Sequence, residues 1–356
     1  MAQRSMFDVQ VSNAQNALAA GDSQWDALAL SAGPAAPFIT SGWLSAWFKT
    51  YGRNQTGHIV RVNSGNRLIA AAAFSKYGNT LRFAGQGPSD YTDVLLSQDL
   101  DDSAATSAAR SILEACATLD SGHRTLRLVR FHPESRTLDL LHRYEHGLRV
   151  IDRVDVQAPA LDLSEVDSRL RKRSVRRHFN TLRRQGDLVC YTYRDEKDVL
   201  EQLGNLFDLH VARWQRTNTP SLFSDPVSRD FYRRITPVLA SLEMLRFTTL
   251  KLDDHIVACH FGMASGDRFY WYKPAFDPEY ARFSPGEVLL KFLLEQARDE
   301  HLRVFDFTIG AEPFKLRFAS EIHRTHRVLL TRSKPRYLFE WAKARVMSGV
   351  DRITGA

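Results

Sequence analysis

The chain has 356 residues, of which 44% are hydrophobic and 25% are charged, and its formal net charge is +7. This length fits about two domains with real hydrophobic cores. No apolar run is long enough to span a membrane and the start of the chain lacks a signal-peptide pattern, so we expect a cytoplasmic protein. The three cysteines, Cys116, Cys190 and Cys259, are isolated from one another. Their spacing favours buried free thiols over disulfides or a zinc site, and we expect no metal.

The excess of positive charge lies in the second half of the chain. Residues 1–160 contain 15 lysines and arginines and 15 aspartates and glutamates, whereas residues 161–356 contain 33 and 26. We therefore expect an anionic partner, such as a phosphorylated cofactor, a nucleotide-linked substrate or a membrane surface, to meet the second half.

The first half of the chain is predicted to contain both helices and antiparallel strands. A strand over Phe7–Val11 precedes two tryptophan-rich helical patterns within residues 25–48. Alternating segments between His58 and Leu96 predict antiparallel strands. The remaining expected elements are a helix over 101–119, a strand over 125–130 and a helix over 134–144. Together they predict an α/β or α+β unit.

One loop between two of these strands is rich in polar side chains and reads Gly85-Gln86-Gly87-Pro88-Ser89-Asp90-Tyr91-Thr92-Asp93. Its glycines do not form a dinucleotide-binding fingerprint, because GxGxxG fails at Asp90 and no helix follows. The segment is either a plain loop or, through Asp90, Tyr91 and Asp93, part of a substrate-binding cleft.

A basic segment follows the extended crossover at residues 150–163. Arg169–Arg184 contains eight lysines and arginines beside an apolar stripe, which predicts an amphipathic helix ending before Gly186. Its basic face is either solvated or turned toward a phosphate or polyanion. No recognisable nucleic-acid-binding motif accompanies it.

Three antiparallel strands are expected further along, over residues 244–252, 256–264 and 268–273, after a strand over 188–193 and helices over 199–217 and 228–242. His260 shares a strand face with the small residues Ala258 and Gly262, and Tyr270 and Tyr272 share a face of the next strand. Small neighbours leave room for a ligand to approach His260. The alternative interpretation, which has equal weight, is a core histidine whose hydrogen bonds are satisfied within the protein.

The next segment predicts a β-loop-α-β unit whose helix begins at an anion site. Ser284, Pro285 and Glu287 have the spacing of a capping box, with proline in the first helical position. A helix N-terminus offers unpaired N–H groups and the positive end of the helix dipole, and Gly286 permits close approach of a ligand. The pattern suits a phosphate, although a capping box also serves simply to begin a helix.

The chain then continues with a strand that carries Asp306 and a turn that carries Lys315. A strand over 327–332 and a basic amphipathic helix over 337–350 complete it. That helix either packs on the protein or contacts a membrane or a partner.

These motifs occur in the order of a known family. The matching residues are Pro37-Phe38, Trp43, Ser89-Asp90-Tyr91-x-Asp93, the basic run 172–184, Arg213-Trp214, Ser284-Pro285-Gly286, Phe305-Asp306-Phe307, Gly310, Phe314-Lys315 and Phe318. In this order, over residues 25–330, the chain resembles the GNAT-type acyltransferases of the CelD-like, cellulose-biosynthesis-associated family, which is related to the Fem peptidyltransferases.

The resemblance implies an α/β (α+β) protein of two tandem GNAT-like lobes, over residues 1–155 and 156–333, followed by a basic amphipathic helix over 334–356. Each lobe would have a mixed, mostly antiparallel sheet flanked by helices. The activity implied is transfer of an acyl group from acetyl-CoA or another acyl-CoA to an amine or a sugar-linked small-molecule acceptor, in exopolysaccharide or cell-envelope biosynthesis.

The resemblance also implies site residues. The donor would bind at Arg282, Phe283, Ser284, Pro285 and Gly286, and the acceptor at Asp90, Tyr91, Asp93, Arg213 and Trp214. Amine attack on a thioester needs a base, a polarised carbonyl and an acid for the leaving thiolate. Asp306 or His260 is the expected base, Tyr270 or Tyr272 the expected acid, and Lys315 would pair with an anionic group.

The chain departs from ordinary GNAT enzymes at Glu279–Ser284, where their Gln/Arg-x-x-Gly-x-Gly/Ala loop is absent. Two alternatives therefore stay open. One is a Fem-like aminoacyl transferase that uses charged tRNA, for which the basic helix offers a surface. The other is a non-catalytic scaffold in polysaccharide assembly. Peripheral contact with a membrane or with the polysaccharide-synthesis machinery is a further expectation.

Overall fold

The structure is a computed structural model that describes residues 7–14, 18–119, 125–143, 148–215 and 219–343. The chain divides into two compact units. Unit 1 comprises residues 1–44, 54–155 and 324–356, and unit 2 comprises residues 45–53 and 156–323. Strands β7 (Arg149–Asp162) and β13 (Glu321–Thr331) and helix α3 (Ser41–Lys49) each continue from one unit into the other.

Unit 1 is built on a sheet with the strand order β1-β2-β3-β4-β6-β13. Strands β4 and β6 pair in parallel, whereas the other pairs described along this path are antiparallel. The strands are β1 (Asp8–Asn13), β2 (Gly57–Ser64), β3 (Arg67–Tyr77), β4 (Thr80–Phe83), β6 (Thr125–Phe131) and the short β5 (Leu95–Leu96), which pairs with β3. The helices include α2 (Ser23–Leu30), α4 (Asp102–Thr118) and α5 (Arg136–His142).

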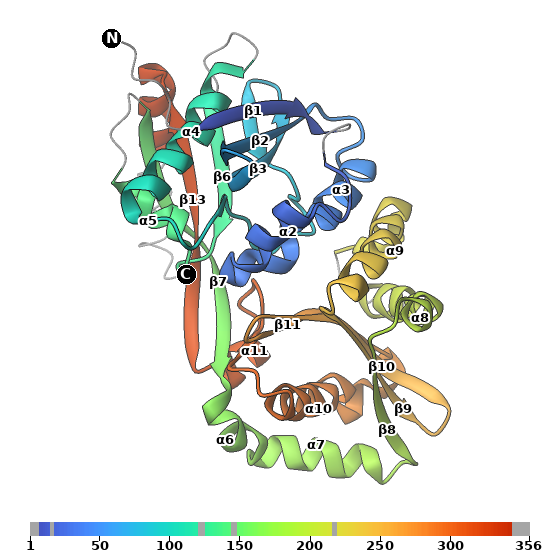
Figure 1. Cartoon of the computed structure of the whole chain (residues 1–356). Coiled ribbons are helices and arrows are strands. Elements are labelled where there is room, and N and C mark those ends of the chain that lie inside the picture. Colours follow the sequence, from blue (N-terminus) through green and yellow to red (C-terminus); the bar gives the residue numbers. More distant parts are fainter. Residues whose placement is uncertain (1–6, 15–17, 120–124, 144–147, 216–218, 344–356) are drawn as a thin grey trace, which may run out of the picture. The chain divides into compact units, whose positions relative to one another are not determined.

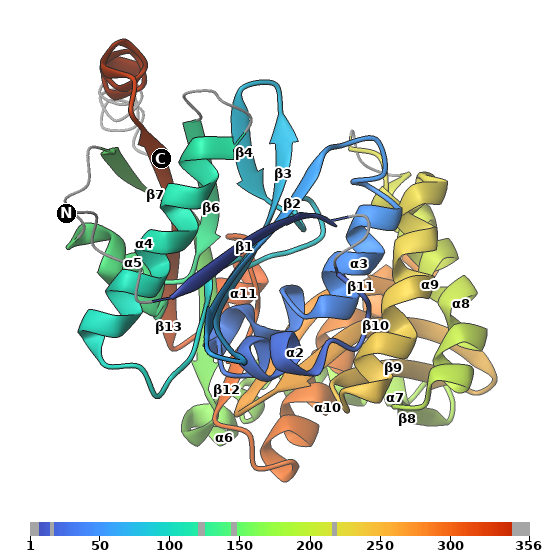
Figure 2. The same cartoon turned by 45° about the horizontal axis from the view of Figure 1, so that its top comes forward.

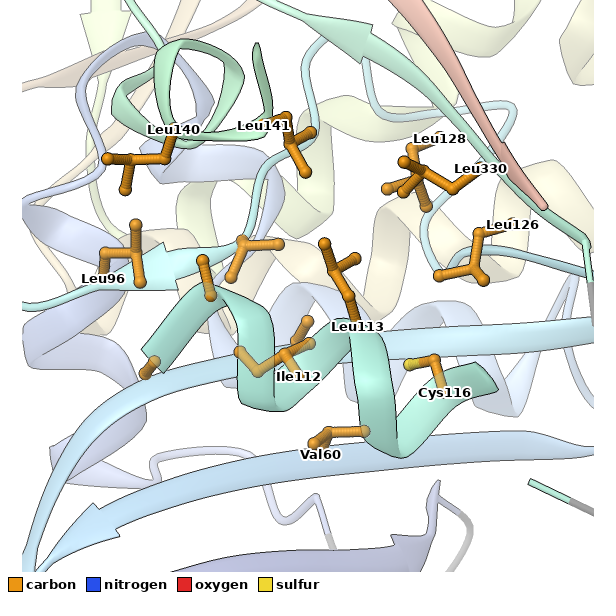
Figure 3. Packing of buried hydrophobic residues seen from close by; sticks show 14 of the residues in the cluster. Val60, Leu96, Ile112, Leu113, Cys116, Leu126, Leu128, Leu140, Leu141 and Leu330 are labelled. Carbon is orange, nitrogen blue, oxygen red and sulfur yellow. The ribbon is translucent and has the colours of Figure 1, made fainter. Parts of the chain in front are cut away.

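The core of unit 1 lies between its sheet and α4. The Asp101 side chain caps this helix by accepting from the N–H of Ala104, and Ile112 and Cys116 recur at helical spacing on the buried face. Figure 3 shows these side chains among Val60 of β2 and the leucines of β6. Burial raises the pKa of the Cys116 thiol, so the predicted buried free thiol is confirmed at this position.

Unit 2 has the strand order β7-β12-β11-β10-β9-β8. Its strands beyond β7 are β8 (Leu188–Tyr193), β9 (Leu245–Leu252), β10 (His255–Ser265), β11 (Arg268–Phe276) and β12 (Val304–Asp306). Helices α7 (Arg173–Arg183) and α10 (Pro285–Asp299) cover one face, and α8 (Glu196–Trp214) and α9 (Pro226–Ser241) cover the other (Figure 1). Figure 2 shows α8 and α9 lying side by side. The predicted fold class, a mostly antiparallel sheet flanked by helices, is confirmed.

Strands β11 and β12 separate soon after they pair. Their parallel pairing covers only residues 268–270 and 304–306. Beyond it the chain after Asp306 bonds to β7, with the N–H of Phe307 on the carbonyl of Pro159 at 3.0 Å and the N–H of Gly310 on that of Gln157 at 2.9 Å. The second half of β11 is therefore left without β12 beside it.

Two sequence predictions need correction. The basic segment forms not one helix but two, α6 (Val166–Leu170) and α7, because Lys172 between them has an extended backbone with ψ 135°. The apolar spacing from Leu170 to Val175 is five residues, which does not return to the same helix face. The last strand also begins earlier than expected, at Glu321, and its residues from Arg324 onward belong to unit 1.

Residues 334–343 are helical, and the rest of the expected C-terminal helix lies outside the described residues. Its Glu340 pairs with Arg127 of β6 at 3.2 Å, while Leu338 and Phe339 are exposed. Within the described part of the chain, no helix combines the length and the apolar character that crossing a membrane requires.

Candidate active site

A cavity of about 230 Å³ opens in unit 2 at the N-terminal end of α10. Strand β11 contributes Trp271 and Phe276 from the part that has left β12. Helix α11 (Pro313–Phe318) contributes Phe314 and Arg317, α8 contributes Arg213, and residues 284–287 complete the wall. The cavity is thus mostly apolar and holds two guanidinium groups.

The start of α10 differs from the predicted capping box. Ser284 joins the 3-10 helix η5 (Pro278–Phe283) to α10 in the left-handed conformation, with φ 55° and ψ 50°, and its side chain makes no capping hydrogen bond. An N-cap side chain normally depends on an extended backbone, so this turn explains the missing cap. Glu287 does not reach back either, because it pairs with Arg317 and lies 3.3 Å from His178. Since Pro285 has no N–H, Gly286 offers the first one of the helix.

Arg213 supplies a positive charge to this cavity. Its guanidinium lies 4.7 Å from the ring centroid of Phe276, and burial lowers its pKa despite the opposing effect of Glu312. No salt bridge joins Arg213 to a carboxylate in the described ranges. An arginine stays protonated under these conditions. A half-buried cation beside a helix N-terminus is the charge arrangement that binds an anion.

Trp271 lines the same wall. Its side chain is 3% exposed, and its indole N–H has no acceptor among the residues that the structure describes. Buried N–H groups without a partner are uncommon in folded proteins. This N–H is itself enclosed, so Trp271 contributes the surface of its ring to the cavity wall.

The residues expected to bind the donor lie in two different places in the structure. Ser284, Pro285 and Gly286 line the cavity, whereas Arg282 and Phe283 line a second, polar hollow beside Asp253 and His255. The left-handed turn at Ser284 sends the chain in a new direction, which separates residues that are adjacent in sequence.

The five residues expected to be catalytic are not among those that line the cavity. Asp306 forms a buried ion pair with Arg268 at 3.1 Å, and its other oxygen accepts from the N–H of Thr308 at 2.7 Å. Thr308 has a φ of 56°, an unfavourable value for a β-branched residue. Asp306 therefore stabilises the turn at which the chain leaves β12.

His260 lies in the core beneath Trp271, with ring centroids 4.8 Å apart. Its Nε2 accepts from the backbone N–H of Tyr272 at 3.0 Å, and burial lowers its pKa to about 3. The space beside Gly262 is filled by the imidazole itself, because a Cβ there would lie 2.2 Å from its Cε1. Its Nδ1 has no hydrogen-bond partner among the described residues, so His260 is a core histidine with only one of its two ring nitrogens satisfied.

The other expected catalytic side chains are buried elsewhere in unit 2. Tyr270 is 1% exposed, and Tyr272 stacks on Tyr232 of α9 at 6.1 Å. Lys315 donates to the carbonyl of Ile309 at 2.7 Å and pairs with Glu312 at 3.1 Å, which closes the turn after β12. The catalytic roles of these residues stay predictions.

Of the residues expected to bind the acceptor, Arg213 lines the cavity and Trp214 stacks on His210 at 5.7 Å, while Asp90, Tyr91 and Asp93 are buried in unit 1. The sequence analysis missed Trp271 and Arg317 as site residues. Arg317 lies two positions after Lys315 on the short helix α11. The sequence motif that singled out Lys315 therefore indicated the right helix but not the residue that lines the cavity.

The stability of the protein should fall as the pH drops below 6.5. The pKa is lowered to about 3 for His260 by burial, and to about 4 for His210 by burial and then by Arg213 and Lys273. An unfolded histidine has a pKa of about 6.5, so below that pH the unfolded chain holds protons that the folded protein lacks. Each histidine then removes about 1.4 kcal/mol of unfolding free energy per pH unit.

Urea unfolding of the wild type and of His260→Gln at pH 7, 6 and 5 measures this effect. The unfolding free energy of the variant should depend less steeply on pH. The difference in slope should correspond to about one proton taken up on unfolding, because one titrating group is gone. Equal slopes for the two proteins would contradict the assignment.

Comparison with known proteins identifies the fold of unit 2. Residues 169–316 match the family model described as an acetyltransferase (GNAT) domain. None of the curated proteins matches the sequence. The GNAT prediction is therefore confirmed at the level of this domain, and the CelD-like family stays a prediction.

Several solved structures are similar to most of the chain. One is the C-terminal domain of a protein named as a lysylphosphatidylglycerol synthetase from Agrobacterium fabrum, with a TM-score of 0.59, 14% identity, and coverage of 91% of this chain and 95% of that one. FemX has a TM-score of 0.59, 12% identity, and coverage of 86% and 94%. L-PGS from Bacillus licheniformis has a TM-score of 0.59, 14% identity, and coverage of 92% and 97%. At these identities the likeness shows the fold alone.

Proposed function

We propose that unit 2 is an acyltransferase that holds an anionic part of its acyl donor at the N-terminus of α10. The observation that carries this proposal is Arg213, a half-buried guanidinium without a carboxylate partner in the described ranges, on the wall of the cavity at that helix end. The apolar surfaces of Trp271, Phe276 and Phe314 support it. A mostly apolar pocket with a few convergent polar groups is the usual form of a cofactor site.

The donor that we propose is an acyl-CoA, with acetyl-CoA as the first candidate, and the acceptor is an amine or a sugar-linked small molecule. Support comes from the GNAT match over residues 169–316. A role in exopolysaccharide or cell-envelope biosynthesis rests on the CelD-like resemblance of the sequence.

In the proposed reaction the neutral amine attacks the thioester carbonyl, the C–S bond breaks, and the thiolate leaves with a proton. Asp306 or His260 acting through a water remains our candidate base, and Tyr270 or Tyr272 our candidate acid. In the structure Asp306 is paired with Arg268, and the Nε2 of His260 is occupied by the Tyr272 N–H.

Titration with CoA and acetyl-CoA, followed by thermal unfolding, tests the donor. A ligand that binds only the folded state at 100 times its dissociation constant adds about 2.7 kcal/mol of stability, and we expect a clear rise in the unfolding midpoint. An unchanged midpoint with millimolar CoA and acetyl-CoA would reject the acyl-CoA proposal.

A second donor class is favoured by α7. Its surroundings carry six exposed arginines, for which the described residues provide no salt bridge: Arg171, Arg173, Arg176, Arg177, Arg183 and Arg184. The apolar side of α7 packs into the core, where Val175 and Leu182 are buried. An arginine-rich helix face of this kind suits a phosphate backbone, as a Fem-like transfer from charged tRNA requires.

The same unfolding experiment with tRNA separates the two donors. Stabilisation by tRNA that weakens steeply with salt, and is lost in Arg173→Glu/Arg177→Glu/Arg184→Glu, would favour the aminoacyl transferase. A response to neither donor would favour the non-catalytic scaffold.

A further inference from the structure

The polar loop of unit 1, residues 85–93, has a defined conformation. Gly85 has a φ of 92°, and a Cβ at this position would lie 2.5 Å from the Ser89 hydroxyl. The N–H of Ser89 donates to the carbonyl of Gly85 at 3.0 Å, and the indole N–H of Trp43 donates to the Ser89 hydroxyl at 2.9 Å. These contacts place the residues that follow on a fixed backbone.

The polar neighbours of Asp90 have their hydrogen bonds satisfied within unit 1. The N–H of Thr92 donates to the carbonyl of Arg130 at 3.1 Å, and its hydroxyl donates to that of Val129. The carboxylate of Asp93 accepts from the N–H of Val94 at 2.7 Å and from the hydroxyls of Ser135 and Thr137. The oxygens of Asp93 are therefore occupied.

Asp90 differs from these neighbours. Its side chain is only 4% exposed, and no hydrogen bond or ion pair joins its carboxylate to any residue in the described ranges. Its oxygens are not among the fully enclosed side-chain atoms without a partner, so a small group can reach them. Burying a carboxylate without a partner costs stability, and buried charges in proteins are normally paired.

We propose that Asp90 is the anchor of a cation-binding site in unit 1, whose ligand carries an ammonium or a guanidinium group. A single carboxylate suits such a group, because it pairs with one charge through one or two hydrogen bonds. A metal ion would require several ligands, and the nearby Asp93 is already engaged. The rigid loop then acts as a preorganised support, which lowers the entropic cost of binding.

The proposed site predicts a change in the unfolding midpoint of the ligand-free protein when Asp90 is substituted. Asp90→Asn removes a buried charge that has no partner, so we expect its unfolding midpoint to rise by about 2 °C or more. A carboxylate with a structural role would instead lower the midpoint on substitution, and that result would overturn the proposal.

Binding is tested with glucosamine as the ammonium probe, agmatine as the guanidinium probe and N-acetylglucosamine as the uncharged match of glucosamine. At least one cationic probe should raise the midpoint of the wild type, and N-acetylglucosamine should not. A response to agmatine alone would assign the site to guanidinium groups.

Variants of the two buried aspartates complete the experiment. Asp90→Asn should abolish the response to the cationic probe, whereas Asp93→Asn should retain it, since the Asp93 oxygens are occupied by the loop's own hydrogen bonds. The absence of any response to both cationic probes, or an unchanged response in Asp90→Asn, would overturn the proposal. CoA binding in unit 2 is measured separately, so a failure of the proposed donor would not produce either result.

Discussion

Asp306→Asn is expected to destabilise the protein by about 3 kcal/mol or more, whatever its part in catalysis. The substitution leaves the guanidinium of Arg268, which is 4% exposed, without its carboxylate partner at 3.1 Å. It also disturbs the acceptor for the Thr308 N–H, at a residue whose φ of 56° is unfavourable. Urea unfolding at pH 7 measures the loss.

A double variant supplies the control for this prediction. Arg268→Met/Asp306→Leu removes both charges together and should be more stable than Asp306→Asn, because no buried charge is left unpaired. A loss below about 1 kcal/mol for Asp306→Asn would contradict the structural role of the pair. Where the loss is large, low activity of this variant is not by itself proof that Asp306 is the base.

Gly286→Phe is expected to abolish donor binding while the protein stays folded. The backbone of Gly286 is not left-handed, and an added Cβ would meet Phe276 Cδ1 at 3.5 Å, an ordinary contact. A larger side chain at this position enters the cavity of about 230 Å³ and covers the first N–H groups of α10. We expect the apparent affinity for the donor to fall at least about 100-fold, which corresponds to about 2.7 kcal/mol.

The matched control at this position is Gly286→Ala. It adds one methyl group in ordinary contact, so its unfolding midpoint and most of its donor-induced stabilisation should remain. Isothermal titration with the donor that stabilises the wild type compares the three proteins. Donor binding by Gly286→Phe at wild-type strength would place the donor outside this cavity.

The periodic parts of the chain were predictable because their pattern reflects local chemistry. Helix α10 begins at Pro285 as expected, and β9, β10 and β11 form the expected antiparallel strands around turns at Asp253-Asp254 and Gly266. The basic segment was predictable as helical, and its break at Lys172 agrees with the five-residue apolar spacing from Leu170 to Val175, which the prediction of a single helix did not use.

Site residues were harder to predict, since each depends on contacts across the fold. Asp306 was a plausible base in the sequence, and only the packing of β11 against β12 shows that Arg268 and Thr308 engage it. Trp271 resembled a core aromatic, and only the structure shows that it lines the cavity, just beyond the last residue of β11 that pairs with β12.

The sequence by itself determined most of the helices and strands, the concentration of positive charge in the second half, and the helix that begins at Pro285. These properties follow from apolar spacing, the position of proline and composition, which act over a few neighbouring positions. The tertiary structure alone decided which side chains face that helix end and which carboxylates are engaged. Arg213 is 72 positions before Pro285 in the chain, and only folding places it on the same cavity wall.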